Sequence, residues 1–121
     1  MWYAASVIMY VQFKDGVQDK YPIWENVILF EATSDAEVYR KAERVGRQGE
    51  GDSEGSFRWE NRPARWVFGG VRKLIKCSTP LDMENTPVDG TEITYSQMSV
   101  DSEQALNQLV NGESVTVTYE E

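Results

Sequence analysis

Alternating apolar positions at the start of the chain predict a long first β-strand. Residues 2–13 are rich in β-branched and aromatic side chains. One parity of this run is almost wholly apolar and comprises Tyr3, Ala5, Val7, Met9, Val11 and Phe13. A period of two is typical of a strand with a buried face. Gly16 marks a turn, and residues 23–32, after Pro22, predict a second strand antiparallel to the first.

A capped helix is predicted after the second strand. Ser34 is placed to accept a hydrogen bond from a free backbone amide, and Glu37, three residues later, to reach back and close a capping box. The apolar stripe expected on the buried side of this helix comprises Val38, Ala42 and Val45. We expect the helix to run to about Arg44 and to stop at Gly46.

A β-hairpin is predicted in the middle of the chain. Residues 46–55 hold four glycines and almost no apolar side chain, which indicates a mobile loop. Residues 56–61 and 64–77 resemble two strands around a turn at Asn61-Arg62-Pro63, and Gly69-Gly70 indicates a bulge or bend in the longer strand.

The last third of the chain predicts a strand, a helix and a strand. Residues 78–90 indicate a loop and residues 91–97 a fifth strand. Asp101 and Gln104 form a second capping pair before a short helix, and the strict alternation of residues 114–119 predicts a closing strand. The order β-β-α-β-β-β-α-β favours an α+β fold, with a mainly antiparallel sheet and both helices packed on one face.

Charge is unevenly distributed along the 121 residues, whose length and 40% hydrophobic content fit one domain spanning 1–121. The net charge is −8, yet residues 56–76 carry six basic side chains and one acidic, and residues 77–121 carry nine acidic and none basic. The overall negative field disfavours general nucleic-acid binding. The basic segment still leaves room for one small anionic ligand or an acidic protein surface.

The residue types that the sequence contains argue against most catalytic mechanisms. Histidine is absent, which removes the commonest general base and every imidazole metal ligand, and a lone Cys77 forms no internal disulfide or zinc site. Carboxylate pairs drawn from Glu25, Glu31 and Glu60 are expected by chance among twenty acidic residues. We therefore expect no enzyme, cofactor or metal site. No secretory leader or membrane span is evident, so we expect a cytoplasmic protein.

The segment 58–66 is the strongest candidate for a binding site. It combines two indoles with three guanidinium groups, supplied by Arg58, Trp59, Arg62, Arg65 and Trp66. In one interpretation the aromatic face belongs to the core and the arginines lie on a plain surface. In the other, a tryptophan is exposed beside the arginines and takes part in binding.

Several short aromatic segments resemble a known family. They are Trp2-Tyr3-Ala4-Ala5-Ser6, Ile23-Trp24-Glu25-Asn26-Val27, Ser34-Asp35-Ala36-Glu37, Arg65-Trp66-Val67-Phe68-Gly69-Gly70-Val71 and Asp89-Gly90-Thr91-Glu92. Together they resemble an uncharacterised family of small bacterial proteins, a domain of unknown function whose members open with a Trp-Tyr-Ala strand. The resemblance spans most of residues 2–98. It implies a bacterial, cytoplasmic, single-domain protein and brings no activity, cofactor or catalytic residue with it.

Two functional hypotheses follow from the sequence. The first is a small non-enzymatic interaction protein, adaptor-like or immunity-like, that binds a protein partner or a second copy of itself. Self-association would bring the basic hairpin to acidic residues such as Glu113, Glu120 or Glu121. The alternative is a pocket for a small anionic ligand, such as a nucleotide, formed by the arginines and tryptophans of the hairpin.

Overall fold

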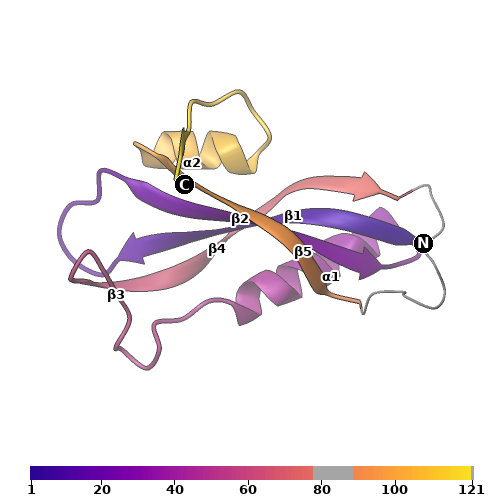
Figure 1. Cartoon of the computed structure of the whole chain (residues 1–121), viewed down its shortest axis with the longest axis horizontal. Helices are drawn as coiled ribbons and strands as arrows, with labels where there is room; N and C mark the ends of the chain where they lie inside the picture. Colours follow the sequence, from indigo (N-terminus) through magenta and orange to yellow (C-terminus); the bar gives the residue numbers. More distant parts are fainter. Residues whose placement is uncertain (78–88, 121) are drawn as a thin grey trace.

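Six strands form one antiparallel sheet in the computed structural model, which describes residues 1–77 and 89–120. The strands are β1 (Trp2–Phe13), β2 (Tyr21–Glu31), β3 (Arg58–Trp59), β4 (Arg62–Lys76), β5 (Thr91–Val100) and β6 (Thr118–Tyr119). The helices are α1 (Asp35–Gln48) and α2 (Glu103–Val110). The strands lie side by side in the order β3-β4-β1-β2-β5-β6 (Figure 1). The α+β class and the predicted order of elements are confirmed.

The boundaries of several elements differ from the predicted ones. The closing strand is limited to Thr118–Tyr119 because only these residues pair with β5, although the alternating pattern begins at residue 114. The α2 helix is capped by Ser102, whose hydroxyl accepts from the Ala105 amide, and not by Asp101. The loop predicted at 78–90 lies outside the described residues except for its last two positions. No helix in the described ranges is long and apolar enough to cross a membrane.

The two helices cover opposite faces of the sheet, so the expectation that both pack on one face is wrong (Figure 1). The physical reason is that β1 is apolar on both parities. Its odd-numbered residues, such as Val7, pack in a core with Val38 and Ala42 of α1. Ile8, on the opposite face and 0% exposed, packs in a second core with Leu106 of α2. Each apolar face of β1 therefore needs a separate helix to bury it.

Gly46 lies inside α1 and does not end it. The helix continues to Gln48 and is capped at Gly49. Gly46 is buried because the Phe68 ring of β4 lies directly against its Cα, where a side chain would overlap the ring. The glycine is thus selected by close helix-sheet packing and not by a turn. The predicted apolar stripe of Val38, Ala42 and Val45 is confirmed.

The predicted cap of α1 is confirmed, with a small change of partner. The Ser34 hydroxyl accepts from the Glu37 amide at 3.2 Å. The Glu37 carboxylate reaches back to Thr33, accepting from its amide at 2.9 Å and its hydroxyl at 2.8 Å. These hydrogen bonds, first the one from the Thr33 amide, lower the pKa of the Glu37 carboxyl below its usual 4.5.

Replacing Gly46 tests the close packing of α1 on β4. Alanine normally favours a helix over glycine by up to about 1 kcal/mol. Gly46→Ala is nevertheless expected to lower the free energy of unfolding by about 1–3 kcal/mol, because the added methyl group meets the Phe68 ring. The matched control is Gly49→Ala, where the new carbon would lie 3.2 Å from the flexible Met9 Cε and should change stability little. Equal stability of both variants in urea unfolding would contradict this packing.

The cap of α1 predicts a pH dependence. A carboxyl with a lowered folded-state pKa adds stability that is fully present above its unfolded pKa, near 4.5, and is lost as the pH falls through the folded value. Wild type should therefore exceed Glu37→Gln in unfolding free energy by a constant amount at neutral pH, and this difference should shrink below pH 4.5. Urea unfolding of both proteins from neutral pH to about pH 3 measures it. A difference that does not vary with pH would show that the carboxylate plays no part.

Candidate functional site

The predicted hairpin is present, with its turn placed earlier than expected. The two residues of the turn are Glu60 and Asn61, whose φ angles are 52° and 62°. Two consecutive positive φ values are typical of the tight turn that matches the twist of a β-hairpin. Arg62 and Pro63 consequently belong to β4, where they pair with Trp59 and Arg58 of β3.

Both hairpin tryptophans pack against a third one, Trp24 of β2. The ring centroids of Trp24 and Trp66 are 5.0 Å apart, and those of Trp24 and Trp59 are 5.6 Å apart, in both cases edge to face. Phe57 stacks on Trp66 at 5.6 Å. We call Trp24, Trp59, Trp66 and Phe57 the indole cluster. All four side chains are half-buried, and they lie on the face of the sheet that carries α1.

The three hairpin arginines do not converge. Arg62 lies over the Phe13 ring at 3.7 Å and donates to the carbonyls of Asp15 and Val17, so it holds the β1–β2 turn. Arg65 donates two hydrogen bonds to the Gln12 side chain, at 2.7 and 3.0 Å. Its neighbour Trp66 pairs with Val11, which places Arg65 and Trp66 on opposite faces of β4.

Arg58 of β3 is exposed, but it pairs with Pro63, whereas its neighbour Trp59 pairs with Arg62. Arg58 therefore extends from the face of the hairpin opposite to the indole cluster. Among the described residues, no ion pair involves this side chain. It therefore remains available to a partner, whereas Arg62 and Arg65 already have partners within the chain.

A hollow of about 370 Å³ lies beside the hairpin and is lined in part by Arg65 and Trp66. Its other lining residues include Glu50 and Asp52. Asp52 pairs with Lys14. This ion pair, together with a hydrogen bond from the Gly55 amide, lowers the pKa of the Asp52 carboxyl. The hollow thus holds two carboxylates against one guanidinium, which disfavours an anionic ligand there.

A polar cluster on the opposite face of the sheet was not predicted as a site. Ser6 of β1 is only 6% exposed, and its hydroxyl donates to Oε2 of Glu25 at 2.5 Å. Arg72 Nε lies 4.0 Å from the same oxygen, and Arg72 also donates to the Leu109 carbonyl of α2. Lys73 stands opposite Ser6 on β4. We call Ser6, Glu25, Arg72 and Lys73 the Glu25 cluster.

Sequence reasoning considered Glu25 only as one of three acids. The structure does not bring the three together: Glu31 pairs with Trp2 at the far end of β2, and Glu60 lies in the hairpin turn. The partners of Glu25 are set by strand register and by an irregularity in β4, which composition does not reveal. The available signal was Ser6, which interrupts the apolar run of β1.

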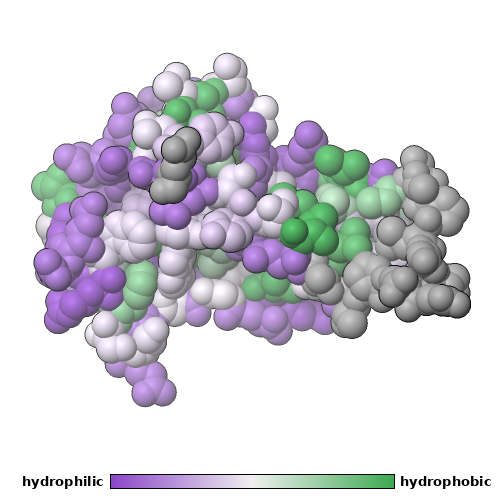
Figure 2. Space-filling view, viewed as in Figure 1, coloured by the Kyte–Doolittle hydropathy of each residue, from purple (hydrophilic) through white to green (hydrophobic). Residues whose placement is uncertain are grey.

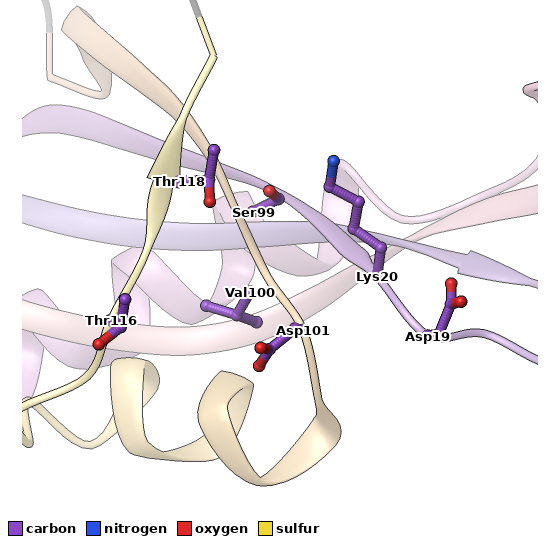
Figure 3. A pocket seen from close by; sticks show the side chains of 7 residues that line it. All are labelled: Asp19, Lys20, Ser99, Val100, Asp101, Thr116 and Thr118. Atoms are coloured by element: carbon purple, nitrogen blue, oxygen red, sulfur yellow. The ribbon is translucent and has the colours of Figure 1, made fainter.

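Another cavity, of about 250 Å³, lies between the segment before β2, the end of β5 and the C-terminal segment. Figure 3 shows Asp19 and Lys20 on the segment before β2 and Asp101 just after β5, with side chains that do not point to a common centre. Nor do the described ranges contain a group of three or more cysteine, aspartate or glutamate side chains placed to hold a metal ion. The side chains around this cavity therefore do not form a group in mutual contact, whereas three of the four in the Glu25 cluster do.

Comparison with known proteins places the chain in a family. Residues 2–96 match the domain of unknown function DUF4288. No curated protein and no solved structure matches the chain. The match covers β1 to β4 and about half of β5, and therefore both the indole cluster and the Glu25 cluster, while α2 and β6 lie beyond it. The resemblance found in the aromatic segments is confirmed, and the chain belongs to the DUF4288 family of domains of unknown function.

Proposed function

We propose that this chain is a non-enzymatic binding module that contacts a protein partner through the indole cluster. The observation that supports the proposal is that Trp59 and Trp66 both pack on Trp24 while all three indoles stay half-buried. Tryptophan and tyrosine are among the residues most enriched at the positions that dominate protein interfaces. Binding of this kind requires neither a histidine nor a cofactor.

The proposed contact surface continues from the indole cluster onto β5. Helix α1 packs on β4, β1 and β2, so this face of β5 is not among its main contacts. Tyr95 pairs with Asn26, which in turn pairs with Val7, and it therefore lies on the α1 face. The Tyr95 side chain is 58% exposed. Indoles and a phenol thus border one open part of the sheet.

A protein partner fits this surface better than a small anion. The alternative hypothesis, a nucleotide-like ligand held by the hairpin, needs several guanidinium groups directed at one point. Arg62 and Arg65 are bound within the chain, and the adjacent hollow carries Glu50 and Asp52. Arg58 extends from the other face of the hairpin, so the three guanidinium groups have no common centre. The partner that we propose is another protein or a second copy of this chain.

We place this binding function in the cytoplasm as part of the proposal. The support is the amino-acid composition: one cysteine leaves the fold without an internal disulfide, and Cys77 sits half-buried at the end of β4.

Site-specific photo-crosslinking in cells tests the proposal. A photoreactive phenylalanine at Tyr95, beside the indole cluster, should give a discrete covalent adduct. The same substitution at Tyr39 is the matched control, because Tyr39 is a 48% exposed tyrosine on α1. Adding Trp59→Ala should reduce the Tyr95 adduct about tenfold or more, as expected for a residue that contributes strongly to an interface.

The mass of the adduct identifies the partner. Twice the mass of the chain indicates self-association, and any other discrete mass indicates a different protein. A Tyr95 adduct no stronger than that of Tyr39, or one that Trp59→Ala leaves unchanged, would contradict the proposed contact surface.

A further inference from the structure

The Glu25 cluster lies at the centre of the sheet face that α2 covers only in part. Ile8 pairs with Glu25 of β2, and the next even-numbered position of β1, Ser6, pairs with Lys73 of β4. Charged and hydroxyl groups therefore stand side by side on three adjacent strands, on the same face as the core beneath α2. Unlike the indole cluster, this group is directed away from α1.

An irregularity in β4 brings two cations to this group. Ser6 pairs with Lys73 and the next residue, Val7, pairs with Val71, so Arg72 is an additional residue in β4. Such a bulge redirects side chains and is common next to functional sites. Arg72 consequently reaches Glu25 and the Leu109 carbonyl, while Lys73 borders a cavity together with Ser6.

That cavity has a polar end and an apolar wall. Its volume is about 200 Å³, and its lining comprises Ala4, Ser6, Glu25, Val27, Lys73 and Ile75. The Ile75 side chain is 49% exposed, so the apolar wall is open to a ligand. Figure 2 shows apolar surface gathered in the region between α2 and the grey residues. The cavity thus offers one carboxylate, one ammonium group, one hydroxyl and an aliphatic surface.

The charges of the lining restrict the ligand. A simple anion would be repelled by Glu25, and a simple cation by Lys73 and Arg72. Among the described residues, the polar contacts of Glu25 with Ser6 and Arg72 both go to Oε2, which leaves Oε1 as an acceptor for a ligand donor. A molecule with an ammonium group, a carboxylate and a short aliphatic side chain satisfies every part of the lining.

We propose that the Glu25 cluster and its cavity form a binding site for a small zwitterion, namely an α-amino acid with a branched aliphatic side chain. The ammonium group pairs with Glu25, the carboxylate pairs with Lys73, and the side chain packs on Ala4, Val27 and Ile75. This site goes beyond the proposed protein contact, since it lies on the other face of the sheet.

Thermal unfolding with free amino acids tests this site. L-Leucine, L-isoleucine or L-valine should raise the Tm of the full chain by a few degrees at saturation, because a ligand that binds only the folded state stabilises it. N-Acetyl-L-leucine lacks the ammonium charge and L-leucinamide lacks the carboxylate, so each should lose most of the shift. No shift with any of the three amino acids, or equal shifts with leucine and both analogues, would overturn the proposal.

Variants of the full chain locate the binding. Lys73→Met keeps an aliphatic stem and should abolish the leucine shift, and Glu25→Gln should do the same. The matched control is Lys76→Met, because Lys76 pairs with Tyr3 and therefore lies on the α1 face of the same strand. A leucine shift that survives Lys73→Met, or is lost equally in Lys76→Met, would contradict this site. Trp59→Ala, which tests the protein contact, should leave the leucine shift intact, so the two proposals can fail independently.

Discussion

Burial of β1 on both faces is the constraint on which the rest of the structure depends. Ala5, Ile8 and Val11 are all 0% exposed, although Ile8 faces the opposite side from the other two. A central strand of this kind cannot leave either face in water, because each buried aliphatic side chain is worth about 1.5–3 kcal/mol of apolar burial. Its neighbours β2 and β4 fix it by hydrogen bonding, and α1 and α2 must then cover one face each.

The helices are shorter than the sheet that they cover. At about 1.5 Å per residue, the 8 residues of α2 span roughly 12 Å, whereas the 12 residues of β1 extend for roughly 40 Å. On the α1 face, the indole cluster lies on the part of the sheet that the helix does not cover. On the other face, the Glu25 cluster occupies the corresponding place beside α2. Both candidate binding surfaces thus lie where the helical cover ends, and where side chains of mixed character replace a continuous apolar core.

Features that depend on local sequence were predictable, and features that depend on cross-strand pairing were not. The period of two in β1 and the Ser34–Glu37 cap act within a few residues, so the strand and helix start were found. The role of Gly46 depends on Phe68, and the packing of the hairpin indoles depends on Trp24, both distant along the chain. Arg72 reaches Glu25 only because β4 has an additional residue there.

Native-state hydrogen exchange followed by NMR tests most directly whether β1 joins the two cores into one cooperative unit. If it does, the hydrogen-bonded amides of residues 4–10 should exchange only by global opening, with a free energy equal to that from urea unfolding. Amides of α2 and the β3–β4 hairpin should exchange at lower free energy. Exchange of the β1 amides at a lower free energy than those of β2 or β4 would contradict the central role of this strand.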